Sequence, residues 1–219
     1  MTRGHFISIE GGEGTGKSTQ IHRLLERLRA EGLGVIQTRE PGGSMGGERI
    51  RALILEAGQS RFDPLTETLL FYAARNDHLE HVIRPALAVG KWVICDRFTD
   101  STRVYQGGNT AVLASVFDVL DQLVVRETQP ELTLVLDLPA EIGLARAHAR
   151  RGLAAADGFE AESIHFHRAL REGFLELAHA NPHRCVVIDA QGNVDEIAER
   201  IWRAVSERFL SVNSVNSNG

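Results

Sequence analysis

A glycine-rich stretch between an apolar segment and an amphipathic one constrains this chain more strongly than any other feature. Residues 11 to 18 fit the phosphate-loop pattern G-x-x-x-x-G-K-[ST] at every fixed position. The preceding Phe6–Glu10 is typical of a short β-strand, and the following Gln20–Leu28 has apolar residues at helical spacing. The pattern therefore predicts a loop that joins a strand to a helix N-terminus and binds a nucleoside triphosphate. The predicted nucleotide-binding residues are Gly11, Gly12, Glu13, Gly14, Thr15, Gly16, Lys17, Ser18 and Thr19.

Each residue type in this loop has a chemical reason to be there. Glycines let successive backbone N–H groups point at one anion, and the unpaired N–H groups of the helix N-terminus favour negative charge. Lys17 is expected to reach the β- and γ-phosphates, and the Ser18 hydroxyl to hold Mg²⁺. The alternative is a glycine-rich turn that matches by chance. The flanking strand and helix and the Lys17-Ser18 pair argue against it.

Short apolar runs separated by helical patterns predict the fold class. The expected strands are 6–10, 35–38, 92–95, 132–136 and 185–188, and the expected helices after the first are 48–55, 65–87, 111–126, 140–151, 164–179 and 194–210. Such alternation is typical of a parallel sheet covered on both sides, a three-layer α/β domain. We expect one domain over residues 1–210, followed by a disordered tail, 211–219.

The composition is that of an ordinary globular protein. The chain has 219 residues, 43% of them hydrophobic, and a formal net charge of −5, so it lacks the basic footprint of a nucleic-acid-binding protein. We find no apolar leader and no membrane-length apolar run, and therefore expect a cytoplasmic protein without a membrane partner. Cys95 and Cys185 lie in apolar runs, where thiols pack as small core residues, so we expect no disulfide.

Polar residues follow two of the predicted strands. The segment 39–43, Arg-Glu-Pro-Gly-Gly, follows the second strand, and Asp96-Arg97-Phe98 follows the third. A carboxylate beside a guanidinium can orient Mg²⁺ and bind a second phosphate, as two phosphorylated substrates require. A surface ion pair that closes a strand is the alternative for Asp96 and Arg97, and a simple turn is the alternative for residues 41–43.

Two further pairs share helix faces. Phe71 and Arg75 are four residues apart, so that a ring could stack on a pyrimidine while a guanidinium donates to a carbonyl oxygen. On spacing alone, core packing is the more common role of such a pair. Arg146 and Arg150 also share one side of a helix, with Arg151 adjacent, and a solvated basic face is their alternative.

Four motifs, taken together and in order, resemble thymidylate kinase. They are Thr38-Arg39-Glu40-Pro41-Gly42-Gly43, Leu70-Phe71-Tyr72-Ala73-Ala74-Arg75, Asp96-Arg97-Phe98 and Tyr105-Gln106-Gly107, within a resemblance that spans residues 6 to about 200. The resemblance implies a P-loop nucleoside monophosphate kinase fold with sheet order 2-3-1-4-5. It also implies transfer of the ATP γ-phosphate to dTMP with Mg²⁺ during dTTP biosynthesis, by a homodimer.

The resemblance assigns the dTMP site. It gives the dTMP phosphate to Arg97, with Arg39 and Glu40 beside it, and places Pro41 near the sugar and base. It gives the thymine ring to Phe71, the thymine O4 to Arg75, the base N3 to Thr102, and the face of the deoxyribose that excludes a 2′-hydroxyl to Tyr105. Ser101 and Gln106 line the same pocket, and Glu13 faces the 3′-hydroxyl directly or through water.

A lid is expected over residues 146–160. Thymidylate kinases carry their catalytic arginine either in the phosphate loop or in the lid, and Gly14-Thr15 supplies none in the loop, so this chain resembles the lid-arginine type. We assign this role to Arg150, with Arg146 as the nearest alternative. Gly158 stands where the family's lid motif usually has an arginine, and Arg151 is the residue that can substitute for it.

Two other functions share part of this motif pattern. A deoxynucleoside kinase also joins a phosphate loop to an Asp-Arg pair, but it takes an uncharged nucleoside, and the segment 39–43 argues for dTMP. A regulatory module that binds ATP without phosphoryl transfer is the second alternative. The presence of Lys17, Ser18, Asp96, Arg97 and Arg150 together argues against it.

Overall fold

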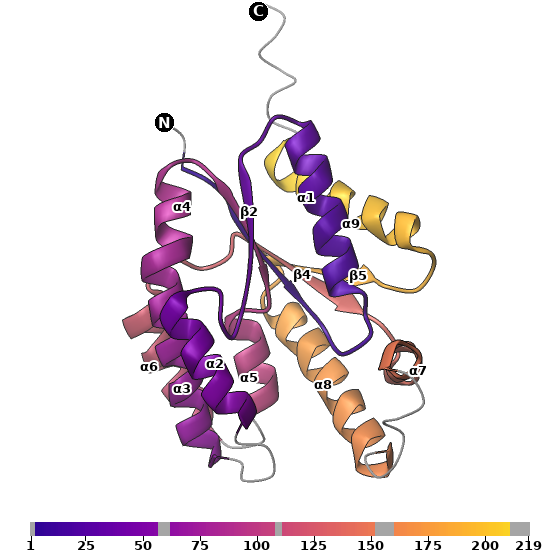
Figure 1. Cartoon of the computed structure of the whole chain (residues 1–219). Helices are drawn as coiled ribbons and strands as arrows, with labels where there is room; N and C mark the ends of the chain where they lie inside the picture. Colours follow the sequence, from indigo (N-terminus) through magenta and orange to yellow (C-terminus); the bar gives the residue numbers. More distant parts are fainter. Residues whose placement is uncertain (1–2, 57–61, 108–110, 152–159, 211–219) are drawn as a thin grey trace, which may run out of the picture.

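Five parallel strands form one sheet at the centre of the computed structural model, which describes residues 3–56, 62–107, 111–151 and 160–210 (Figure 1). The strand order is β2-β3-β1-β4-β5. The strands are β1 (Phe6–Glu10), β2 (Val35–Arg39), β3 (Trp92–Asp96), β4 (Leu132–Asp137) and β5 (Cys185–Asp189). Their short, mostly apolar sequences suit strands that helices cover on both faces. The predicted fold class and sheet order are confirmed.

The helices follow the predicted positions, except that α5 was not predicted and that π-helical turns interrupt the helix over 65–87 and end the one over 111–126. They are α1 (Lys17–Ala30), α2 (Met45–Glu56), α3 (Pro64–His78), α4 (Arg84–Ala88), α5 (Thr99–Gln106), α6 (Ala111–Leu120), α7 (Ala140–Arg151), α8 (Glu160–Ala180) and α9 (Val194–Phe209), with π-helical turns η1 (Leu79–Ile83) and η2 (Asp121–Val125). The helix expected over 65–87 was also expected to be perturbed at Pro85, which has no N–H to continue the α-helical ladder, and η1 divides it just before that residue. The sequence did not predict α5, because the residues it buries are polar.

Two apolar layers hold the sheet between the helices. On one face, Ile7 and Ile9 of β1 join a core to which α1 and α9 contribute, for example through Leu25 and Ile201. On the other face, Phe6 joins a core built from α3, η1, α4 and α6. Figure 1 shows α1 and α9 together on one side of the sheet, away from α2, α3 and α6. Alternate side chains of one strand therefore serve two cores, as expected for a three-layer domain.

The strand register brings the functional loops to one edge. Ile9 of β1 pairs with Asp96 of β3, and Arg39 of β2 pairs with the same residue. Because all the strands are parallel, the phosphate loop, the segment after β2 and the Asp96-Arg97 pair emerge side by side. Cys95 and Cys185 are buried free thiols, as predicted. Across the described ranges, no helix is long and apolar enough to cross a membrane.

Candidate active site

The phosphate loop connects β1 to α1 and packs closely on α7. Gly14 has φ +70°, and a Cβ there would lie 1.9 Å from the carbonyl oxygen of Gly143. A side chain at position 14 would therefore clash with the first turns of α7. Gly16, with φ +89°, is the N-cap of α1. The loop thus keeps both a left-handed backbone turn and a free helix N-terminus, which together bind anions well.

Two polar side chains of the loop lie where a triphosphate would bind. Lys17 Nζ donates hydrogen bonds of 2.8 Å to the carbonyl oxygens of Gly11 and Gly12. These bonds hold the ammonium group against the inner side of the loop, so its charge adds to that of the loop N–H groups. Ser18 is exposed on the first turn of α1.

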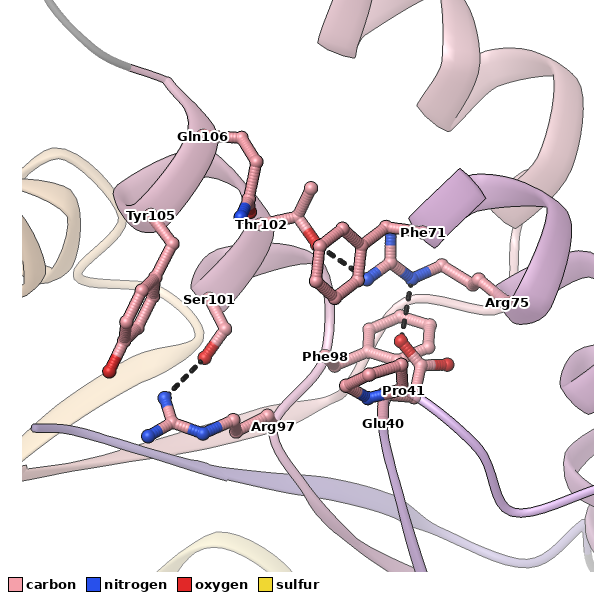
Figure 2. A pocket seen from close by; sticks show the side chains of 10 residues that line it. All are labelled: Glu40, Pro41, Phe71, Arg75, Arg97, Phe98, Ser101, Thr102, Tyr105 and Gln106. Atoms are coloured by element: carbon pink, nitrogen blue, oxygen red, sulfur yellow. Dashed lines mark hydrogen bonds and ion pairs between the residues drawn. The ribbon is translucent and has the colours of Figure 1, made fainter. Parts of the chain in front are cut away.

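A pocket of about 180 Å³ opens at the carboxyl ends of β2 and β3. Its walls come from the segment after β2, from α3, and from the segment that runs from Arg97 into α5 (Figure 2). The lining residues are Glu40, Pro41, Phe71, Arg75, Arg97, Phe98, Ser101, Thr102, Tyr105 and Gln106. The sequence prediction of the dTMP site included all of these except Phe98. The structure therefore gathers residues from all four motifs of the sequence around one cavity.

One end of this pocket carries an arginine held on several sides. Arg75 is 1% exposed, and it donates from Nε to Glu40 Oε2 and from Nη2 to Thr102 Oγ1, both at 2.8 Å. Its guanidinium carbon lies 4.6 Å from the ring centroid of Tyr72 and 5.1 Å from that of Phe98. Burial disfavours the charge, but Glu40, Tyr72 and Asp121 together outweigh this effect and raise the pKa of Arg75. The guanidinium therefore stays charged and has a fixed orientation.

The third nitrogen of Arg75 is available to a ligand. Arg75 Nη1 is buried and finds no acceptor among the described residues. A buried donor without an acceptor is costly, so this atom is suited to a carbonyl oxygen supplied by a bound molecule. Figure 2 shows the guanidinium next to the ring of Phe71, which comes from the preceding turn of α3. A flat ring with a carbonyl group fits such an arrangement.

The other end of the pocket carries Arg97. Its φ of +69° is uncommon for a residue other than glycine, and its backbone N–H is anchored to the Ile9 carbonyl at 3.0 Å. Arg97 Nη1 donates to Ser101 Oγ at 2.9 Å, and the guanidinium carbon lies 5.0 Å from the ring centroid of Tyr105. Among the described residues, Arg97 forms no ion pair with a carboxylate. Its guanidinium can therefore bind a phosphate.

A buried carboxyl group lies beneath Arg97. Glu10, the last residue of β1, accepts hydrogen bonds from Ser101 Oγ at 2.5 Å and from the Phe98 N–H at 2.7 Å. Complete burial, and then the nearby Asp100 carboxylate, raise the pKa of Glu10 to about 8. The sequence analysis did not single out this residue. Its signal was an acidic residue at the end of an otherwise apolar strand.

This raised pKa predicts a pH-dependent stability. Native Glu10 binds a proton between pH 4.5 and about 8, whereas the unfolded side chain releases it at its ordinary pKa of 4.5. The free energy of unfolding should therefore fall as pH rises through this window, by up to about 1.4 kcal/mol per pH unit. Glu10→Gln should remove this part of the slope, and the exposed Glu31→Gln should not. Urea unfolding of the three proteins from pH 5 to 8 measures it; parallel wild-type and Glu10→Gln curves would refute it.

Asp96 is the carboxylate at the end of β3. Its Oδ1 is buried and accepts no hydrogen bond from the residues that the structure describes. An unpartnered carboxylate oxygen near a phosphate loop fits the outer coordination of Mg²⁺, a cation that keeps several of its waters. The donor set of Asp96 and the exposed Ser18 hydroxyl consists of oxygens, which Mg²⁺ prefers.

Two predicted dTMP residues lie outside the lining of this pocket. Arg39 Nη2 donates to both carboxylate oxygens of Glu48 on α2, at 2.9 and 3.0 Å. Glu13 lines a neighbouring cavity between the phosphate loop, the end of β4 and α8. Glu40, expected beside the phosphate arginine, directs its carboxylate at Arg75 and His78 instead.

A second cavity, of about 520 Å³, lies on the other side of the phosphate loop. It is bounded by the loop and the start of α1, by Arg146 and Ala149 of α7, and by the segment from Gly192 to Val194 before α9. Arg146 Nη1 donates to the Ala190 carbonyl at 3.4 Å. The sequence analysis missed the 192–194 segment, because a turn before a helix carries no motif of its own.

The predicted lid is described only in part. Residues 146–151 form the last turns of α7, whereas the side chains of Arg150 and Arg151 and the segment 152–159, with Asp157 and Gly158, lie outside the described residues. The tail predicted for 211–219 lies outside them as well. The close packing of Gly143 on the phosphate loop fixes where α7 begins. The later residues of α7 therefore extend from a helix start that lies against the phosphate loop.

Comparison with known proteins gives one consistent result. A family model described as "Thymidylate kinase" matches residues 9–201. A thymidylate kinase from Caulobacter vibrioides is 55% identical over 209 residues, which cover 95% of this chain and 99% of that protein. One from Nitrobacter winogradskyi is 52% identical over 212 residues, covering 97% and 92%. The crystal structure of thymidylate kinase from Ehrlichia chaffeensis aligns with a TM-score of 0.73 at 33% identity, covering 93% of this chain and 99% of that one.

Proposed function

This chain belongs to the thymidylate kinase family and phosphorylates dTMP to dTDP, with ATP as the donor, and we propose which of its residues do so. The phosphate loop and the 520 Å³ cavity beside it bind ATP, and the 180 Å³ pocket binds dTMP. The observation that carries this assignment is the position of Arg97. It joins the dTMP pocket to the strand edge from which the phosphate loop emerges.

The ATP site uses both sides of the loop. The backbone N–H groups from Gly11 to Thr19 and the Lys17 ammonium bind the β- and γ-phosphates. The adenosine enters the cavity between α7 and the segment before α9, where Arg146 and Asn193 supply polar contacts.

The dTMP site divides into a base end and a phosphate end. Thymine lies against Phe71, with its C4 carbonyl oxygen accepting from Arg75 Nη1 and its N3 near Thr102. The 5′-phosphate lies on Arg97, and the deoxyribose lies over Tyr105, with Pro41, Ser101 and Gln106 around it. Arg39 and Glu13 contact the nucleotide only from the rim of the pocket. Arg39 does so after its hydrogen bonds to Glu48 break, and Glu13 contacts the 3′-hydroxyl.

Catalysis here is positioning and neutralisation of charge. A phosphate oxygen of dTMP, held by Arg97, faces the γ-phosphorus of ATP, held by Lys17. This oxygen forms a bond to the γ-phosphorus while the bond to the β-phosphate oxygen breaks, so that dTDP forms and ADP leaves. No covalent enzyme intermediate is needed for this transfer. When bound, Mg²⁺ supplies positive charge to the phosphate oxygens of ATP, and Ser18 with Asp96 would hold it. Residues 146–160 act as a lid, from which Arg150 neutralises charge on the transferring group.

Substitution of Arg97 tests the phosphate end. Arg97→Ala should weaken dTMP binding by about 10- to 100-fold, because a charge-assisted hydrogen-bonded partner of the phosphate is lost. Thymidine, which has no phosphate, should bind within about threefold of its wild-type affinity. Calorimetric titration of both ligands measures this, with the exposed Arg203→Ala of α9 as control. Equal losses for dTMP and thymidine would contradict the assignment.

A homodimer is the assembly that fits the surface. Leu65 and Leu69 of α3 are 45% and 48% exposed, and Val119 and Leu123, at the end of α6 and in η2, are 61% and 64% exposed. Each pair is spaced four residues apart and so forms an apolar strip on its helix. Since α3 also contacts η2, the two strips lie in neighbouring elements. Apolar strips of this kind mark subunit contacts.

Cytoplasmic location completes the proposal. Both cysteines of the chain are free thiols, which suits a reducing compartment.

A further inference from the structure

A chain of buried polar side chains leads away from the base end of the dTMP pocket. Glu40 binds Arg75 through Oε2, and its Oε1 lies 3.0 Å from His78 Nδ1. His78 Nε2 in turn lies 2.5 Å from Thr38 Oγ1. We propose that His78 is a positioning residue for base selection: it fixes the Glu40 carboxylate, and through it aims Arg75 at the C4 carbonyl of the pyrimidine. This inference rests on the dTMP site proposed above.

Because these side chains are buried, each needs its hydrogen-bond partner. His78 is 0% exposed and Glu40 is 6% exposed, so water cannot replace a lost hydrogen bond at either side chain. The carboxylate has two oxygens, of which Oε2 accepts from Arg75 and Oε1 faces His78. Without His78, Glu40 Oε1 would have no hydrogen-bond donor in the buried interior. The carboxylate would then rotate to accept a hydrogen bond from a second nitrogen of Arg75. Arg75 would then offer less to the substrate.

The partners of His78 define its hydrogen-bond roles. Arg75 and Glu40 form a buried ion pair, 1% and 4% exposed at their side chains. A carboxylate oxygen can only accept a hydrogen bond, so His78 Nδ1 donates to Glu40. His78 Nε2 forms its hydrogen bond with the Thr38 hydroxyl, which can donate or accept. Consecutive hydrogen bonds therefore connect Thr38 to Arg75.

Arg75 Nη1 is the atom that would distinguish one pyrimidine base from another. With Nε on Glu40 and Nη2 on Thr102, the remaining nitrogen can only donate to a ligand. Thymine presents a carbonyl oxygen at C4, and 5-methylcytosine presents an amino group, which cannot accept this hydrogen bond. The pair dTMP and 5-methyl-dCMP therefore probes the direction of Arg75 while keeping the methyl group, the sugar and the phosphate unchanged.

The experiment compares kcat/KM for dTMP with kcat/KM for 5-methyl-dCMP in matched variants. His78→Phe keeps a flat ring but removes the donor, and should lower the preference for dTMP by about 10- to 100-fold, mainly through a higher KM for dTMP. The KM for ATP should change by less than about twofold. His78→Asn keeps an N–H near the position of Nδ1 and should retain most of the preference. His81→Phe, at an exposed histidine of η1, should change nothing.

The outcomes separate this inference from the assignment of the base site. Arg75→Gln must itself abolish most of the preference for dTMP; if it does not, the proposed base site is wrong and this inference fails with it. If Arg75→Gln abolishes the preference and His78→Phe leaves it unchanged, only the role of His78 is refuted. Should His78→Phe not fold, Thr38→Val removes the hydroxyl at Nε2 and should shift the preference in the same direction by about threefold. An unchanged preference in Thr38→Val would then overturn the inference.

Discussion

Lys17→Ala should lower kcat for dTMP phosphorylation by about 10³-fold or more, the scale on which single cationic groups act in phosphoryl transfer. The Lys17 ammonium lies against the Gly11 and Gly12 carbonyls on the inner side of the loop, where we propose that the phosphates of ATP bind. It does not line the pocket assigned to dTMP. The dissociation constant for dTMP should therefore change by less than about twofold.

The chain offers a matched control for this variant. Lys91 is its only other lysine and is exposed before β3, so Lys91→Ala should retain wild-type kinetics. Steady-state kinetics and calorimetric titration with dTMP measure the two effects separately. If the affinity for dTMP falls as steeply as kcat in Lys17→Ala, ATP and dTMP do not occupy separate subsites.

Arg150→Ala should lower kcat by about 10³-fold while both KM values stay nearly unchanged. The transition state spreads negative charge over the oxygens of the transferring group, and the phosphate loop carries no arginine to neutralise it. Arg150 lies four residues after Arg146 in α7, the helix whose start is packed on the loop. A lid residue that meets the phosphates only after closure contributes to the transition state more than to substrate affinity.

Arg146→Ala distinguishes the two arginines of this helix. Arg146 lines the cavity assigned to adenosine, so its loss should raise the KM for ATP and change kcat less. Presteady-state measurement of the transfer step, with both variants at saturating ATP, separates chemistry from binding. A larger loss of kcat in Arg146→Ala than in Arg150→Ala would move the catalytic role to Arg146.

Most of the fold followed from the sequence because most of its strands contain short apolar runs. The run from Trp92 to Cys95 is buried on both faces, and such an apolar run can be predicted as a strand without knowledge of its neighbours. Helix α5 was missed for the opposite reason. Its buried residues, among them Asp100 and Ser101, are polar, and they are satisfied by long-range partners such as Arg184 and Glu10. Hydrophobic periodicity carries no information about such a helix.

The site shows the same limit. Motif residues such as Arg75 and Arg97, which line the pocket, could be named from the sequence because they belong to motifs of the family it resembles. Glu10 and His78 could not be named in this way. Glu10 contacts Ser101, and His78 contacts Glu40, so each depends on a partner 38 or more positions away in the sequence. A buried titratable residue without a motif has a signal only once the structure shows its partners.

A crystal structure of the protein with dTMP and a non-hydrolysable ATP analogue tests the central assignment most directly. We expect the thymine ring against Phe71, with its C4 oxygen within about 3 Å of Arg75 Nη1, and the dTMP phosphate on Arg97, facing a γ-phosphate held by Lys17. A thymine ring bound away from Phe71 and Arg75, or a dTMP phosphate that does not contact Arg97, would contradict the account.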